Sequence, residues 1–318
     1  MDDNQAPEPL ATILEQLTGG QPIDDRNYGA LSDLAAADAA QLRESWARIP
    51  AELREATLSH AADLADERID LEFSALARVG LDDPEADVRL SALEAIGDST
   101  ERSLGARLSQ MLDADPDERV RAGVAAVLRQ FVMAIEFDQF PRAEGEAIVR
   151  SLRARFEDSG EDTLARALSL EALGPHSARW MAAAIGHAYA SDEREMRLAA
   201  IRAMADSADD AWLDYIFEQV ESEDPEFRFE AAVACGSIGS TDAVEPIARL
   251  LADDDPSVVT AAIEALGEIG GSAALEELRA FAPHVPEGTE ETVREAMAAA
   301  SELAAFEDDD SDDDEDDD

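Results

Sequence analysis

The chain has 318 residues, of which 74 are acidic and only 25 are basic, and its formal net charge is −49. Binding to a nucleic-acid backbone needs a basic stripe, so this balance argues against nucleic acid as a partner. A single cysteine excludes an internal disulfide framework, and no apolar run approaches the ~18 residues of a membrane-spanning helix. The first residues lack the basic and apolar regions of a signal peptide, which predicts a cytoplasmic protein.

The acidic excess is spread along the chain. The last twelve residues hold eleven acids, yet the remainder still carries −38, and all 25 basic residues are arginine. Such a charge opposes compaction in dilute salt, whereas at ~1 M salt the screening length falls to about 3 Å. We therefore expect a fold suited to concentrated salt. The alternative is an acidic chain that binds a basic partner.

Residues 1–30 are predicted to form a flexible N-terminal arm that carries one short amphipathic helix. Its apolar stripe has helical spacing and ends at Gly19-Gly20; the stripe consists of Leu10, Ile13, Leu14 and Leu17. This helix either docks on the rest of the chain or acts as a detachable arm that binds a partner.

Residues 31–80 are predicted to be a helical cap. Trp46 and Ile49 share a helix face, Pro50 stands where the next helix begins, and a third helix covers about 70–80. A cap of this kind is expected at the end of a stack of repeats, because it covers the apolar face of the terminal repeat.

Residues 81–282 repeat with a period near 31. Residues 224–239 and 255–270 are identical at seven of sixteen positions, and a fixed period of this length predicts a solenoid. Each copy carries an apolar stripe at i, i+4, i+7 and i+8. The six stripes are Val88, Ala92, Ala95, Ile96; Val120, Val124, Val127, Leu128; Ala165, Ser169, Ala172, Leu173; Met196, Ala200, Ala203, Met204; Phe227, Ala231, Ala234, Cys235; and Val258, Ala262, Ala265, Leu266.

Helix boundaries are marked in most copies. Asp-Pro pairs at 83, 115, 224 and 255 each offer an N-cap carboxylate and a proline at the first helical position. The glycines at 97, 174, 236 and 267 follow the stripe and are expected to let neighbouring helices approach closely. Gly239 and Gly270 are expected to end their helices. A second apolar helix follows each first one.

One interval breaks the period. Equivalent positions of the second and third copies are 45 residues apart instead of 31 or 32, which places an insertion near 131–145, with Phe131, Phe137 and Phe140 as expected anchors. Insertions in solenoids are often functional. Residues 283–306 are predicted to form a C-terminal capping helix, and residues 307–318 a disordered acidic tail.

The period, the Asp-Pro caps, the Val-Arg pair and the Ala-Leu-Gly-x-Ile-Gly ending resemble HEAT repeats, in particular the short prokaryotic type named after phycobilisome lyases. The lysine-free acidic surface resembles proteins of halophilic archaea. The resemblance implies an all-α solenoid of about six two-helix repeats with atypical helical caps at both ends. It does not imply a reaction, because fold does not determine function.

An arginine follows the first stripe position in five of the six copies: Arg89, Arg121, Arg166, Arg197 and Arg228. The first turn of a helix disfavours a cation, so each arginine needs an acceptor. We expect a structural ladder in which each guanidinium meets a carboxylate or carbonyl of the adjacent repeat. An anion-binding groove is the alternative.

Aromatic side chains on the second helices of copies three and four form a candidate partner-binding patch: Trp180, Tyr189, Tyr215 and Phe217. Core packing is the favoured interpretation of this group, and an exposed partner-binding patch is the alternative. Cys235 holds a stripe position and is expected to be a buried hydrophobe. The four histidines have no metal-ligand spacing, and no phosphate loop, nucleophile elbow or dinucleotide fingerprint is present, so we predict no catalytic, metal or cofactor site.

These features favour a non-enzymatic, monomeric scaffold or assembly factor that binds another protein along the concave face of the solenoid. The alternative is a lyase or chaperone of chromophore attachment, which the name of the repeat type implies. A DNA glycosylase on a similar fold is disfavoured by the charge.

Overall fold

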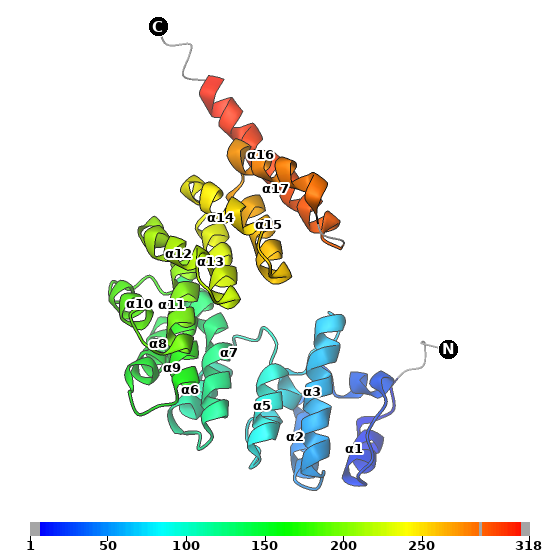
Figure 1. The fold of residues 1–318 in the computed structure, drawn as a ribbon. Helices are drawn as coiled ribbons and strands as arrows, with labels where there is room; N and C mark the ends of the chain where they lie inside the picture. Colours follow the sequence, from blue (N-terminus) through cyan, green and yellow to red (C-terminus); the bar gives the residue numbers. More distant parts are fainter. Residues whose placement is uncertain (1–6, 286–287, 313–318) are drawn as a thin grey trace. The chain divides into compact units, whose positions relative to one another are not determined.

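The computed structural model describes residues 7–285 and 288–312, with side chains up to residue 305. Every regular element over these residues is helical (Figure 1). The chain divides into two compact units, Met1–Ala172 and Leu173–Asp318, which are described separately below. The predicted all-α class is confirmed.

Six helix pairs make up the repeats. The first helices are α5 (Ala86–Glu94), α7 (Glu118–Glu136), α9 (Thr163–Leu173), α11 (Arg194–Ser207), α13 (Pro225–Ile238) and α15 (Pro256–Ile269). The second helices are α6 (Arg102–Ala114), α8 (Arg142–Glu157), α10 (Met181–Tyr189), α12 (Leu213–Val220), α14 (Val244–Leu250) and α16 (Gly271–Phe281). Short 3-10 turns precede α12 and α14, at Asp210–Trp212 and Thr241–Ala243, and another, Ala282–His284, follows α16.

In the second unit the first helices stack closely, whereas the second helices are less in contact with one another. α13 packs along both α11 and α15, and α15 packs along α17 (Glu290–Asp312). Glycine allows this approach: a Cβ on Gly236 would lie 3.0 Å from the Cα of Ala265, and one on Gly267 would lie 2.9 Å from the Cα of Ala296. Because the first helices are closer together than the second helices, the first helices form the inner side of this stack.

The N-terminal part of the first unit consists of α1 (Leu10–Thr18), a 3-10 turn η1 (Asp25–Ala30), α2 (Ala36–Trp46), α3 (Ala51–Glu67) and α4 (Ser74–Gly80). α3 packs along α5 and so continues the layer of first helices. The apolar side chains Ile13, Leu14 and Leu17 of α1 are buried, and α1 contacts α2 and η1. The structure thus describes the docked arrangement of this helix.

The acidic tail departs from the sequence-based prediction. We predicted disorder from residue 307, but α17 continues to Asp312. Extending an existing helix avoids the cost of nucleation, so the packed part of α17 can continue into residues that would not form a helix alone. Residues 313–318 lie outside the described part of the chain.

Two of the four predicted N-caps are also wrong. Asp224 and Asp255 are N-caps, and each accepts the backbone N–H two residues on. In the first two repeats the N-caps are Glu85 and Asp117 instead, and the Asp-Pro pairs stand two residues earlier. The aspartates of those pairs, Asp83 and Asp115, accept arginine side chains in addition to the backbone N–H two residues on.

The extra residues between the second and third copies lengthen helices. α7 has 19 residues against 14 in α13, and α8 has 16. Phe131 and Phe140 are buried in an edge-to-face contact at 5.5 Å, as expected of anchors. Phe137 is not an anchor: its side chain is 66% exposed, because it lies where α7 has passed the end of its neighbour α5.

Candidate functional site: an open groove along helix α7

The first-helix stack of the first unit is interrupted between α5 and α7. α5 ends at Glu94, and Gly97 adopts a left-handed conformation with φ 60°. The equivalent Gly236 stays inside α13 and is packed against α15. A Cβ on Gly97 would meet nothing within 4 Å, so this glycine does not provide the close approach predicted for it.

The chain sequence explains why α5 ends early. Two residues after the glycine, the fifth and sixth copies have Ile238 and Ile269, whereas the first copy has Ser99. Without an apolar side chain to bury, a last helical turn gains little from packing, and Gly97 supplies the positive φ that ends the helix.

α7 is therefore partly uncovered along one face. Leu93 of α5 still lies against Gly123, where a Cβ would be 3.1 Å from its Cδ1. Beyond that point Val127 is half-exposed, although its counterpart Ala265 in α15 is buried. The exposed face continues through Met133 to Phe137.

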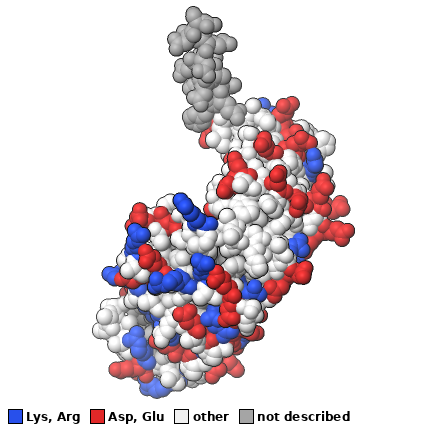
Figure 2. Space-filling model, turned by 90° about the vertical axis from the view of Figure 1, so that its left-hand side faces the viewer, with Lys and Arg blue, Asp and Glu red and all other residues white. Residues whose placement is uncertain are grey.

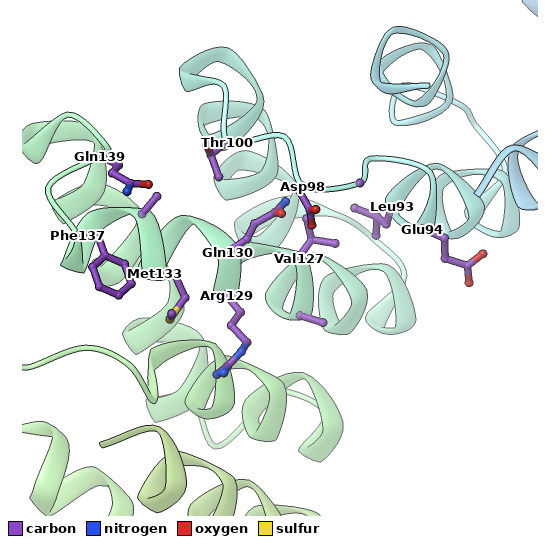
Figure 3. A pocket seen from close by; sticks show the side chains of 13 residues that line it. Leu93, Glu94, Asp98, Thr100, Val127, Arg129, Gln130, Met133, Phe137 and Gln139 are labelled. Carbon is purple, nitrogen blue, oxygen red and sulfur yellow. The ribbon is translucent and has the colours of Figure 1, made fainter. Parts of the chain in front are cut away.

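The result is a groove with a volume of about 760 Å³ (Figure 3). Figure 3 shows Leu93 and Glu94 of α5 at one end of the hollow, and at the other end Met133 of α7 and Phe137, the residue that follows α7. The residues that line it are Leu93, Glu94, Gly97, Asp98, Thr100, Ala126, Val127, Arg129, Gln130, Met133, Ala134, Phe137 and Gln139.

The polar side chains of the groove divide into anchored and exposed ones. Gln130 Nε2 donates to the carbonyl of Ser99 at 3.4 Å, which ties the loop after α5 to α7. Arg129 Nη1 donates to the carbonyl of Glu171 at 3.4 Å. Glu94 and Asp98 are exposed, so the α5 side of the groove has an acidic rim.

A second hollow of about 710 Å³ lies on the other side of the loop 95–101. It is lined by Ile69, Phe73 and Ile96, among others, and Ile69 is fully exposed. The loop after α5 therefore has an exposed large apolar side chain on each side, Ile69 and Phe137.

Three of the predicted arginines hold a carboxylate of the following repeat with two nitrogens. Arg89 donates to Asp115 at 2.7 and 2.9 Å, and Arg228 donates to Asp253 at 2.7 and 2.6 Å. Arg121 does the same with Glu161 at 2.6 and 2.9 Å.

Each of these arginines also donates to the carbonyl six residues earlier, at 2.7 to 2.9 Å. The contact with Arg121 lowers the pKa of Glu161 to about 2, and that with Arg228 lowers the pKa of Asp253.

The remaining two predicted arginines have other neighbours. The Arg197 guanidinium lies 4.5 Å from the centre of the Phe227 ring, and Arg166 Nε donates to the carbonyl of Phe156 at 3.3 Å. The position that holds the carboxylate in the other repeats is Ser191 in the sequence register of Arg166 and Ser222 in that of Arg197. Each serine hydroxyl accepts the backbone N–H two residues on. A serine has no second oxygen to accept a guanidinium fork.

One member of the same arrangement has no place in the sequence period. Arg54 of α3 contacts both oxygens of Asp83, at 3.0 and 3.2 Å, and the indole N–H of Trp46 donates to the same carboxylate at 2.6 Å. The interval from Arg54 to Arg89 is 35 residues, outside the period of 31. The sequence feature that points to this contact is the Asp-Pro pair at 83, because in the other repeats such a pair follows a repeat helix.

The four candidate partner-binding aromatics lie on or directly before the second helices α10 and α12. Tyr189 and Tyr215 meet edge to face at 5.5 Å, and the Tyr189 hydroxyl donates to the Tyr215 carbonyl at 3.0 Å. Burial and Glu218 raise the pKa of Tyr189 to about 12. Tyr215 is 45% exposed, and Trp180 and Phe217 are half-buried. The Trp180 ring lies at an oblique angle to the His176 ring, with the ring centres 5.9 Å apart.

The layer that carries Tyr215 is not the inner one. The sequence left two places open for Trp180 and Tyr215, the core and the inner face of the stack. The inner side of the second unit is formed by its first helices, α11, α13, α15 and α17, whereas Tyr215 belongs to α12.

No reactive side chain stands out in the described part of the chain. Cys235 is buried as predicted, and burial raises the pKa of its thiol to about 12. Among the described residues, no three His, Cys, Asp or Glu side chains are grouped to hold a metal ion. Within the same ranges, no helix is both long and apolar enough to span a bilayer. On the face drawn in Figure 2, blue arginines lie beside red carboxylates rather than in a separate basic area.

Comparison with protein families supports the repeats directly. Residues 182–259 and 220–302 match the family model described as HEAT repeats, so this part of the chain is built from HEAT repeats. None of the curated proteins matches the sequence significantly.

Solved structures with similar folds are distant in sequence. The YibA protein of E. coli is 17% identical over 94% of this chain and 98% of its own, with a TM-score of 0.46. An engineered protein is 18% identical over 93% of this chain and 84% of its own, with a TM-score of 0.42. Kap95p, which binds RanGDP, is 16% identical over 92% of this chain, with a TM-score of 0.47; the match spans 44% of the Kap95p chain. Similarity at this level carries no argument about function.

Proposed function

We propose that this chain, which is built in part from HEAT repeats, is a non-enzymatic scaffold or assembly factor that binds another protein. The observation that carries the proposal is the groove along α7. Val127, Met133 and Phe137 leave apolar surface open beside the point where α5 stops short. Such open apolar surface marks interaction sites on soluble proteins.

The groove lies on the layer of first helices. By the repeat register, Ala126 and Gln130 of α7 correspond to Glu264 and Glu268 of α15, both of which are exposed. The groove thus lies on the first-helix layer of the first unit, and the equivalent layer of the second unit forms the inner side of its own stack. This placement supports the predicted use of the concave face.

The chromophore-attachment alternative gains no support from Cys235, which is buried and whose thiol has a raised pKa. We also propose that the repeats are of the short prokaryotic type, that the protein is of halophilic origin, and that it is monomeric and cytoplasmic. These proposals rest on the repeat signature and the lysine-free acidic composition.

The proposal is tested by photo-crosslinking from several surfaces of the full chain. The crosslinking amino acid p-benzoylphenylalanine would replace Phe137 in the groove, Tyr215 in the aromatic cluster or Leu164, an exposed leucine of α9 outside the groove. Lysate kept at about 2 M KCl preserves the short screening length for which the surface is suited. We expect a discrete crosslinked protein from position 137. Failure at all three positions would remove the scaffold proposal.

A further inference from the structure

The partner surface can be described more closely, on the premise that the chain is a scaffold as proposed above. We propose that the groove along α7 binds a short amphipathic helix of another protein, with an apolar face toward α7 and basic side chains toward Glu94 and Asp98. The shape of the gap, the chemistry of its floor and the charge of its rim fit such a segment.

The shape of the gap is that of a missing helical segment. In the second unit, the last turns of α13 lie against α15, with Gly236 close to Ala265. In the first unit α5 ends at Glu94 and lacks the corresponding last turn, while α7 continues to Glu136, past the position at which α13 ends. Together these leave a face of α7 uncovered from Val127 to Phe137, about 15 Å long at 1.5 Å per residue, which matches two to three turns of a helix.

The floor of the gap has the periodicity of a helix–helix contact. Ala126, Gln130, Met133 and Phe137 follow one another at spacings of four, three and four residues on α7. A helix in this position would place its own residues i, i+3 or i+4, and i+7 on Val127, Met133 and Phe137. Met133 is flexible and adapts to the shape of an apolar partner.

The rim of the gap selects the charge of the occupant. Glu94 and Asp98 are exposed on the α5 side, while Gln130 and Gln139 are neutral. Arg129, the basic residue of the lining, already donates to the Glu171 carbonyl. Arginine or lysine on the partner would meet the two carboxylates, and an acidic partner would add like charge to them.

The same charge argues against the chain filling its own groove. Residues 307–318 carry eleven acids, and a second copy carries the same net charge of −49. Either occupant would bring further carboxylates to the acidic rim. Both are outcomes that the experiment below distinguishes.

The first test sequences the segment crosslinked from p-benzoylphenylalanine at position 137 of the full chain. We expect a segment of a different protein with apolar residues spaced by three or four and with arginine or lysine between them. A segment of this chain, or an acidic segment, would overturn the inference. A crosslink at position 215 or 164 without one at 137 would overturn it too, while leaving the scaffold proposal intact.

The second test uses the captured segment as a labelled synthetic peptide, with binding to the full chain followed by fluorescence anisotropy. We expect F137A to weaken binding about tenfold or more, as at an interface anchor. We expect the pair E94Q and D98N to weaken it about twofold to tenfold, with a smaller effect at high salt. L164A is the matched control, since Leu164 is 48% exposed on the same unit but does not line the groove.

Circular dichroism of each variant separates loss of binding from loss of fold. Phe137 is mostly exposed, so F137A should retain the helical spectrum and the melting temperature of the unchanged protein. Equal affinity of the unchanged protein and a folded F137A for the peptide would refute the assignment of the groove. Equal affinity of the E94Q and D98N pair would refute the basic character of the partner.

Discussion

The pair between Arg89 and Asp115 offers the sharpest test of the arginine arrangement. Both side chains are buried, with 8% and 5% exposure, and two of the nitrogens of Arg89 bind the carboxylate. A third nitrogen donates to the carbonyls of Asp83 and Pro84. The substitution Arg89→Met keeps the aliphatic stem but leaves the buried carboxylate without its cation. Breaking a buried pair in this way costs about 3–5 kcal/mol of unfolding free energy.

The measurement must report the first unit alone, because two units need not unfold together. Trp46 is the one tryptophan of residues 1–172 and is buried, with its indole N–H bonded to Asp83. In a background with Trp180→Phe and Trp212→Phe, its fluorescence during urea unfolding follows this unit. Urea is uncharged, so the salt concentration can be chosen independently.

Two further variants decide whether the pair itself is responsible. Asp115→Asn combined with Arg89→Met should cost less than the sum of the single changes, since the unpaired charge is gone. Arg119→Met is the exposed control: Arg119 pairs with Asp87 and Asp117 but is 57% exposed, so the expected cost is below about 1 kcal/mol. A loss below about 1 kcal/mol for Arg89→Met, or additive single effects, would refute the view that this pair stabilises the repeat stack.

Four other outcomes follow from the structure. The pKa of Glu161 is lowered to about 2 in the folded state. The stabilising effect of its ionised carboxylate is therefore present above pH ~5 and is lost as the pH falls towards 2. Glu161→Gln should reduce the fall in unfolding free energy over this range by about 1–3 kcal/mol. Gly236→Ala should destabilise by about 1–3 kcal/mol because its Cβ would lie 3.0 Å from Ala265, whereas Gly186→Ala, with open space around it, should stabilise by about 0.5–1 kcal/mol in the same thermal unfolding assay. Cys235 should react with a thiol reagent at pH 8 only after unfolding, since burial raises the pKa of its thiol to about 12. The melting temperature should rise with KCl concentration as the net charge of −49 is screened, and a melting temperature indifferent to salt would remove the proposal of a halophilic protein.

Local patterns in the sequence were sufficient for the repeat architecture. The stripe at i, i+4, i+7 and i+8 identifies each first helix, because only a helix brings those positions to one face. Asp224 and Asp255 mark helix starts through contacts within three residues, and Gly239 ends α13 with a φ of 72°. All of these depend on neighbours along the chain, which a sequence displays directly.

What covers each face was decided only by the tertiary structure. Val127 and Ala265 hold the same stripe position, yet one is half-exposed and the other buried, because the helix beside Val127 stops short. Phe137, expected to be a buried anchor, is exposed because it follows the end of α7, which the inserted residues lengthen. Arg54 joins the arginine arrangement from outside the period.

The physical reason is common to these cases. A periodic pattern predicts which side chains share a face of a helix. The length of the neighbouring helix depends on two competing effects: the packing gained by about one more helical turn, and the ease with which a glycine adopts the positive φ that ends the helix. That balance is resolved in three dimensions, and here its outcome is the open groove along α7.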